Sequence, residues 1–298
     1  MTFYDLCLAW NWEYDTDFVG FLQLACNSRG LTLLQITPYN LETMKTELLE
    51  GDLRFRSLFD RASDEDERFL PIVFWARQQG LYRINPYRLA RRSWNKAAMH
   101  RAFLSAGLHT PHTIVLPACS EVREPRPPDL GPLGTRFAIK PAHGGGGQGV
   151  INEATNWEQV MMARWQYPED QYLLQAHVVA QHLDSRQAWF RVIYCAGYTY
   201  PFWWDTQTHA YQQVTLEERR EYALDPLWDI ASTMADVCQL QLFSTEIALT
   251  QAGQFTAVDY INDPIDLRLK SKTPQGVPDS IVEAIAHRLA ARVTERLS

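Results

Sequence analysis

The stretch Arg136-Phe-Ala-Ile-Lys-Pro-Ala-His-Gly-Gly-Gly-Gly-Gln-Gly-Val150 decides the fold, because it joins a short apolar strand to a glycine-rich loop. The strand ends on Lys140, and the glycines follow at positions 144, 145, 146, 147 and 149 before β-type residues resume at Val150. Without Cβ atoms such a loop can bring its backbone N–H groups close to an anion, and it can also move. The lysine adds a point charge suited to a phosphate oxygen. The segment therefore predicts a mobile phosphate-binding flap between two strands. The alternative is a flexible surface loop that happens to be rich in glycine.

Two common nucleotide-binding motifs do not fit this stretch. It lacks the Lys-Ser/Thr ending of a P-loop, and no helix opens directly behind the glycines. It also lacks the βαβ context of a dinucleotide fingerprint. A strand, a glycine flap and a second strand are typical of a lid over the phosphates of a nucleotide.

Composition places the chain among ordinary globular proteins. It has 298 residues, of which 46% are hydrophobic and 21% charged, which suits two or three lobes. A net charge of -7 and a pI near 5.6 argue against nucleic acid as a partner. Five scattered cysteines without a CxxC pair indicate reduced thiols and a cytoplasmic protein. No signal peptide or membrane span is expected, because the start has no basic segment followed by a long apolar run.

The first third alternates apolar runs with helical patterns. Strands are expected at residues 3–9, 31–36 and 57–60, and helices at 15–28, 41–50 and 63–80. This alternation predicts a small parallel α/β domain. Residues 10–12 and Asp60-Arg61 would then lie at the carboxyl ends of strands, where open sheets bind ligands. Alternatively, Asp60 and Arg61 form a structural ion pair.

Later segments contain the other elements. We expect a helix after Lys96, a surface loop at 121–135, and a buried strand at 171–178. Hairpin strands are expected at 189–195 and 198–204, and helices at 226–240 and 279–297, the last one for packing.

An acidic hairpin is the second informative segment. Residues 245–249 and 255–262 read as two strands with a turn at 252–253. A two-residue loop would place Glu246 opposite Asp259, so that the two carboxylates repel unless a cation lies between them. Mg²⁺ prefers carboxylate and amide oxygens, which Glu246, Asp259 and Asn262 supply together. The alternative is an exposed strand face with unpaired acids.

Together and in this order, these segments resemble the ATP-grasp superfamily over nearly the whole chain. Members have a small α/β domain, a lobe with a glycine flap and a lobe with a metal-binding hairpin, and the nucleotide lies between the last two. The resemblance implies an α/β protein with the ATP-grasp fold. Its parts would be a Rossmann-like N-terminal domain at 1–92, a flap lobe at 93–180 and a metal lobe at 181–298.

The resemblance also assigns roles by position. Lys96 and Lys140 look like the two phosphate-binding lysines, and Arg191 is similar to the arginine that faces phosphate, so that Lys140 and Arg191 are the implied catalytic residues. The implied metal ligands are Glu246, Asp259 and Asn262. The remaining implied nucleotide contacts come from the flap and the hinge strand: His143, Gly144, Gly145, Gly146, Gly147, Gln148, Gly149, Gln175, His177 and Val178.

Two features depart from the family pattern. No acid stands near Ala176 to bind the ribose hydroxyls. Asp259 and Asn262 are three residues apart, where the family usually has two. This spacing predicts that Asn262 is displaced from the metal site.

The implied reaction uses ATP and Mg²⁺, with Mn²⁺ as a substitute. ATP would phosphorylate a carboxylate to an acylphosphate, and an amine or thiol would then displace phosphate. Lysines, arginine and magnesium would stabilise the moving charge while the flap excludes water. The implied partners are small-molecule or peptide carboxylates and amines, and a second copy of the chain in a homodimer. We expect the substrate site near the acidic hairpin and residues 201–205, with His209 and Tyr211. The aromatic residues there would line an acceptor pocket; the alternative is that they belong to the hydrophobic core. Lys270 and Lys272 are candidates to hold a substrate carboxylate.

Two alternatives remain at this point. The same phosphate-binding residues serve kinases that phosphorylate a small-molecule hydroxyl. A non-catalytic ATP-binding protein would also keep them.

Overall fold

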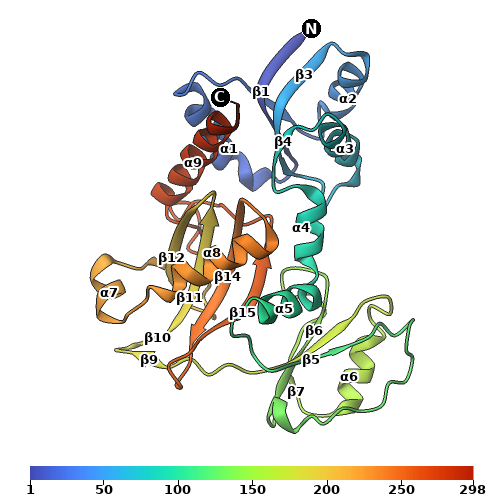
Figure 1. Ribbon diagram of the computed structural model, residues 1–298, viewed down its shortest axis with the longest axis vertical. Helices are drawn as coiled ribbons and strands as arrows, with labels where there is room; N and C mark the ends of the chain where they lie inside the picture. Colours follow the sequence, from blue (N-terminus) through green and yellow to red (C-terminus); the bar gives the residue numbers. More distant parts are fainter. Residues whose placement is uncertain (298) are drawn as a thin grey trace.

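The computed structural model describes residues 1–297 and contains three main sheets (Figure 1). A parallel N-terminal sheet lies at one end, an antiparallel flap sheet at the other, and a five-stranded hairpin sheet between them. Among the described residues, no helix is both long and apolar enough to span a bilayer.

The N-terminal sheet has the order β2-β1-β3-β4, and every neighbouring pair is parallel. Its strands are β1 (Thr2–Trp10), β2 (Leu33–Ile36), β3 (Leu53–Arg61) and β4 (Tyr82–Ile84). They are connected by α1 (Thr16–Asn27), α2 (Leu41–Glu50) and α3 (Leu70–Gln78), with one-turn 3-10 helices η1 (Glu13–Asp15) and η2 (Glu67–Phe69). The expected parallel α/β arrangement is confirmed.

Two details of this domain differ from expectation. The third helix begins at Leu70, after η2, because Asp66 caps η2 by accepting from the backbone of Arg68. Asp60 and Arg61 do not pair with each other, since successive side chains of a strand point to opposite faces. Arg61 instead forms a buried ion pair with Asp15 at 2.7 Å.

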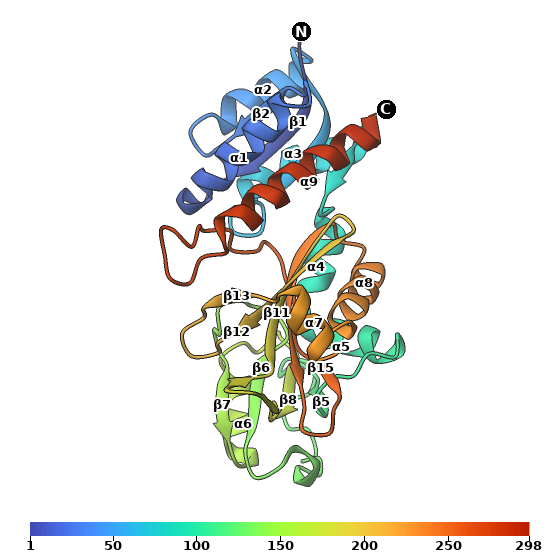
Figure 2. The ribbon, with the colours of Figure 1, turned by 90° about the vertical axis from the view of Figure 1, so that its left-hand side faces the viewer.

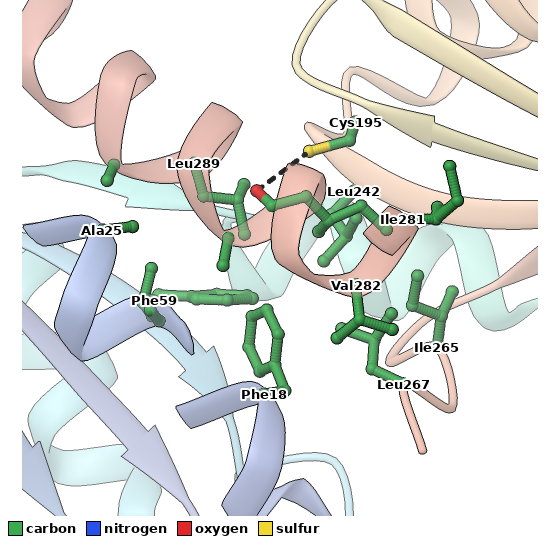
Figure 3. Close-up of a cluster of buried hydrophobic side chains, with 14 of the residues drawn as sticks. Phe18, Ala25, Phe59, Cys195, Leu242, Ile265, Leu267, Ile281, Val282 and Leu289 are labelled. Carbon is green, nitrogen blue, oxygen red and sulfur yellow. Dashed lines mark hydrogen bonds between the residues drawn. The ribbon is translucent and has the colours of Figure 1, made fainter. Parts of the chain in front are cut away.

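The C-terminal helix α9 (Asp279–Leu297) returns to the N-terminal sheet. Figure 2 shows it lying beside α1, and the two helices are in contact. Figure 3 shows the shared core, in which Phe18 and Phe59 of the first domain meet Val282 and Leu289 of α9. The end of the chain therefore completes the core of the domain that its beginning builds.

The flap sheet is antiparallel, with the order β5-β8-β6-β7. Two helices, α4 (Tyr87–Trp94) and α5 (Lys96–Ser105), lead from the N-terminal domain into it. Its elements are β5 (Thr113–Leu116), β6 (Phe137–Pro141), β7 (Ile151–Ala154), α6 (Trp157–Arg164) and β8 (Tyr172–Ala176). The loop at 121–135 holds only the short helix η3 (Gly131–Leu133).

The hairpin sheet is also antiparallel, with the order β13-β12-β11-β14-β15. Its strands are β11 (Trp189–Cys195), β12 (Tyr198–Trp204), β13 (Tyr211–Gln213), β14 (Leu242–Leu249) and β15 (Phe255–Asn262). The helix α8 (Pro226–Cys238) packs on β11 and β12, and α7 (Leu216–Glu221) precedes it. A two-stranded ribbon of β9 (His182–Leu183) and β10 (Arg186–Gln187) connects the flap sheet to this one.

Candidate functional site

The acidic hairpin places Glu246 directly opposite Asp259, as the sequence predicts. The expected two-residue turn is wrong, because Leu249 pairs with Phe255 and the loop spans residues 250–254. A register shift between the pairs at Glu246 and Ile247 adds one residue to β15 and restores the predicted pairing.

A second register shift decides where Asn262 lies. From the pair Glu246–Asp259 to the pair Ser244–Asn262, the chain advances three residues along β15 but only two along β14. In a regular strand, residues three apart would point to opposite faces. Here the amide nitrogen of Asn262 donates to Oδ2 of Asp259 at 3.1 Å. The bulge therefore compensates for the longer spacing and brings the side chain of Asn262 next to Asp259.

Arg191 extends this row onto a third strand. It lies opposite Glu246 on β11, and its Nη1 donates to Oε1 of Glu246 at 2.6 Å. Its Nε and Nη2 approach Oγ of Ser244 at 3.2 Å and 3.0 Å. Because directly paired residues share a face, Arg191, Glu246 and Asp259 form one row across the sheet.

The two carboxylates have opposite electrostatic environments. Burial raises the pKa of Glu246, which Arg191 opposes and Asp259 reinforces. Burial also disfavours the ionised form of Asp259, but Lys140, Arg191 and Lys96 together hold its pKa below the usual value. Asp259 is thus the carboxylate whose ionised form the surrounding positive charges favour, and these charges come from all three implied phosphate-binding residues.

Lys140 is oriented by a network that links the flap sheet to the hairpin. Its Nζ donates to Oε1 of Gln175 at 2.7 Å, on the same face of the neighbouring strand β8. The amide nitrogen of Gln175 lies 3.3 Å from Oγ1 of Thr113 and 3.3 Å from the hydroxyl of Tyr260, which belongs to β15. Gln175 therefore connects Lys140 with the acidic hairpin.

Lys96 connects the start of α5 to the start of the flap. Asn95 caps this helix by accepting from the backbone of Ala98 at 2.7 Å. The backbone nitrogen of Lys96 donates to Ala142 at 2.7 Å, and its ammonium group donates to the carbonyl of Gly144. Burial lowers the pKa of Lys96, while Asp259 acts in the opposite direction.

The flap itself uses the freedom of its glycines. Four of the five have positive φ: +101° at Gly144, +60° at Gly146, +77° at Gly147 and +69° at Gly149. Cβ atoms at positions 144–147 would meet nothing within 4 Å, so this part of the loop has free space on the side where a side chain would stand. A Cβ at Gly149 would lie 2.6 Å from Cε2 of Tyr167. The end of the flap is therefore closely packed and its middle is not.

His143 is held by Asp170, which was not among the site residues predicted from the sequence. The backbone nitrogen of His143 donates to Oδ2 of Asp170 at 2.8 Å, and Nδ1 lies 2.9 Å from Oδ1. His143, Gly144, Gln148 and Asp170 line a cavity of about 480 Å³ beside the flap. No motif in the sequence marks Asp170, because its partner is 27 residues away.

Other predicted residues lie outside this charged cluster. His177, just beyond the end of β8, is 3.6 Å from Glu153 of β7, and Val178 is half-buried. The ammonium group of Lys270 donates to the carbonyl of Tyr211, and Lys272 pairs with Asp17 of α1 at 2.7 Å. In this structure both lysines contact groups of the protein, and their role in holding a substrate carboxylate stays a prediction.

The donor set suits a hard cation that completes its shell with phosphates and water. Within residues 1–297 there is no group of three or more His, Cys, Asp and Glu side chains that could hold a metal ion. Two carboxylates and an amide oxygen are consistent with Mg²⁺, which keeps several waters and usually shares its ligands with phosphate groups. The amide nitrogen of Asn262 donates to Asp259, which leaves its oxygen available for a cation.

Comparisons with known proteins support the fold. No family model matches the sequence, and no curated protein matches it. Among solved structures, the chain is similar to a RimK domain ATP-grasp protein from Sphaerobacter thermophilus, at 18% identity and a TM-score of 0.64, covering 96% of this chain and 98% of that one. It is also similar to the ATP-grasp ligase PsnB in complex with a precursor peptide and AMPPNP, at 13% identity and a TM-score of 0.62, covering 100% and 99%. D-alanine–D-alanine ligase from Bacillus anthracis in complex with ATP matches at 11% identity and a TM-score of 0.63, covering 98% and 99%. The chain therefore has the ATP-grasp fold, as the sequence resemblance predicts.

Proposed function

We propose that this protein is an ATP-dependent ligase that joins a carboxylate to an amine or thiol through an acylphosphate. Mg-ATP would bind between the flap sheet and the hairpin sheet. The observation that carries the proposal is the row Arg191–Glu246–Asp259, with the positive charges of Lys140 and Lys96 acting on Asp259. This arrangement complements the charges of a metal–triphosphate complex: the three cations would face the phosphates, and the two carboxylates and the amide would face the metal ion.

Each group has a role that follows from its position. Lys96 and Lys140 would hold phosphate oxygens. Lys96 is the first residue of α5 and contacts the flap at Gly144, and Lys140 lies on β6, the strand before the flap. Glu246, Asp259 and Asn262 would hold Mg²⁺ or Mn²⁺, which when bound neutralises charge on the phosphates. Arg191 orients Glu246 through their ion pair and faces the same side of the sheet, where it would stabilise the phosphoryl group in transfer.

The reaction needs no nucleophile from the protein. A substrate carboxylate oxygen would attack the γ-phosphorus of ATP, the bond to ADP would break, and an acylphosphate would form. The amine or thiol would then attack the acyl carbon, lose its proton and expel inorganic phosphate. The glycine flap would close over the phosphates and exclude water, which would otherwise hydrolyse the acylphosphate.

The choice of a ligase is supported by the structural neighbours. D-alanine–D-alanine ligase, PsnB and D-cycloserine synthetase are ligases or synthetases by name, and PsnB has been solved with Mg and ADP. They suggest amino acids or peptides as the carboxylate and amine.

The proposal is tested by measuring ADP and phosphate release from Mg-ATP against pooled carboxylates and amines. Substrate-dependent phosphate release, with an acylphosphate that hydroxylamine traps, would establish the ligase. Lys140→Met and Asp259→Asn should each lower turnover by about 10²–10³-fold, because Lys140 would hold a phosphate oxygen and Asp259 would hold the metal ion that neutralises phosphate charge. Lys45→Met is the matched control, since Lys45 pairs with Glu42 on α2 in the N-terminal domain.

Other outcomes would favour other functions. ADP without free phosphate would indicate a kinase. Nucleotide binding without turnover would indicate a non-catalytic ATP-binding protein. Absence of nucleotide binding would overturn the proposal.

A further inference from the structure

A cluster of arginines lies outside the proposed nucleotide site. Arg77 of α3 and Arg88, Arg91 and Arg92 of α4 line a cavity of about 460 Å³, which we call the arginine groove. Figure 1 shows α3, α4 and α5 following one another along one side of the molecule, from the N-terminal sheet toward the flap sheet. The groove therefore lies along the connection between these two parts.

The arginines of the groove have no acidic partners. Across residues 1–297, Arg77, Arg88, Arg91 and Arg92 form no ion pair and no side-chain hydrogen bond, and all four are exposed. Burial lowers the pKa of the nearby Arg83, and the positive charge of Arg77 lowers it further. In a chain with a net charge of -7, acids are abundant, but none of the residues that line the groove is acidic.

The stability of the helices explains the presence of only some of these arginines. Arg91 and Arg92 lie in the last turn of α4, where positive charge stabilises the helix dipole. Arg88 is in the first turn, where positive charge has the opposite effect, and Arg77 belongs to another helix. Like charges three or four residues apart also repel each other. The accumulation of positive charge is thus unfavourable for the isolated fold and favourable for binding an anion.

The spacing of the arginines suits an extended chain. Arg88, Arg91 and Arg92 stand at i, i+3 and i+4 on one helix face, so their attachment points are roughly 5–6 Å apart. Alternate side chains of an extended peptide point the same way and are about 6.5–7 Å apart. Guanidinium groups bind carboxylates with two parallel hydrogen bonds. Aspartate or glutamate at alternate positions of a peptide would therefore match the groove.

The walls of the groove are also suitable for a peptide. Phe74 and Tyr87 line it and pack edge to face with ring centroids 6.3 Å apart, which offers an apolar surface to the intervening side chains. Its other end is lined by Asn95 and His143, which are in contact at the start of the flap. A long polyanion such as nucleic acid would meet the repulsion of the acidic remainder of the protein.

We propose that the arginine groove binds an acidic segment of a peptide, with aspartate or glutamate side chains on alternate residues. This binding needs neither ATP nor turnover, so it stands independently of the proposed ligase activity. Where both hold, the peptide would reach the flap at His143, beside the phosphate-binding Lys96.

The test is fluorescence anisotropy of the full chain with a labelled peptide that alternates glutamate and leucine, without nucleotide. A matched peptide carries glutamine in place of each glutamate. We expect the glutamate peptide to bind more tightly, with an affinity that falls as salt rises. Arg88→Gln/Arg91→Gln should weaken its binding by about tenfold or more, because two charge-assisted contacts are lost. Arg123→Gln/Arg126→Gln, in the 121–135 loop, removes the same net charge elsewhere and should leave binding unchanged.

Several outcomes would overturn this inference. They are no binding of the glutamate peptide, equal binding of the two peptides, or equal loss in both double variants. Stronger competition by polyphosphate or an oligonucleotide than by unlabelled glutamate peptide would assign the groove to another polyanion and would also contradict it. ATP binding and the melting temperature are measured for the same variants. Unchanged values there show that a loss of peptide binding comes from the groove and not from the nucleotide site or from misfolding.

Discussion

The buried ion pair between Arg61 and Asp15 permits a quantitative prediction. Arg61 donates to Asp15 from Nε at 2.8 Å and from Nη2 at 2.7 Å, and the side chains are only 2% and 1% exposed. Arg61 also donates to the carbonyl of Ile265 at 2.9 Å, in the segment between β15 and α9. Arg61 therefore links the end of β3 to η1 through Asp15, and to the segment after β15 through Ile265.

Asp15→Asn removes the negative charge but keeps the size of the side chain. The guanidinium of Arg61 then stays buried without its hydrogen-bonded carboxylate partner, which costs roughly 3–5 kcal/mol of unfolding free energy. This is a large part of the about 5–15 kcal/mol that usually separates folded from unfolded domains. The double variant Asp15→Leu/Arg61→Met removes both charges, so it should be the less destabilised of the two. It loses mainly the hydrogen bond to Ile265, which contributes about 1 kcal/mol.

The measurement is urea unfolding followed by far-UV circular dichroism, with hydrogen exchange of β1, β3 and α9 to locate the effect. Glu42→Gln serves as the control, because it breaks a surface pair with Lys45 and should cost less than about 1 kcal/mol. The reasoning is refuted if Asp15→Asn costs no more than this control, or if the double variant is less stable than the single one.

Two further predictions concern the glycine flap and the buried carboxyl group of Asp263. Gly149→Ala should lower the melting temperature more than Gly147→Ala: both positions have positive φ, but only the Cβ at 149 would collide with Tyr167, and equal losses would contradict this. Burial raises the pKa of Asp263 to about 7, against the opposing hydrogen bond from Asn85, so the folded protein should lose stability as pH rises from about 4 to about 7. Asp263→Asn keeps an acceptor for Asn85 but has no charge to bury. The variant should therefore have a higher melting temperature than the wild type above pH 7 and no advantage near pH 4. Parallel pH profiles of variant and wild type would contradict the assignment.

Local patterns were sufficient for much of the fold. The glycine flap after Lys140, the helix that begins at Lys96 and the last helix could all be predicted, because glycine content and apolar periodicity are properties of short segments. The pairing of Glu246 with Asp259 was also predicted, although two errors cancelled: the loop is longer than expected, and a bulge restores the register.

Only the tertiary structure decided which distant residues meet. The bulge before Asn262 returns its side chain to Asp259, and no local pattern marks it, since a bulge depends on the pairing of two strands. Arg61 finds Asp15 at a separation of 46 residues, and the packing of α9 against α1 joins the two ends of the chain. The sequence by itself therefore determined which groups are available, and long-range packing determined their register and partners, because these depend on contacts that no short segment contains.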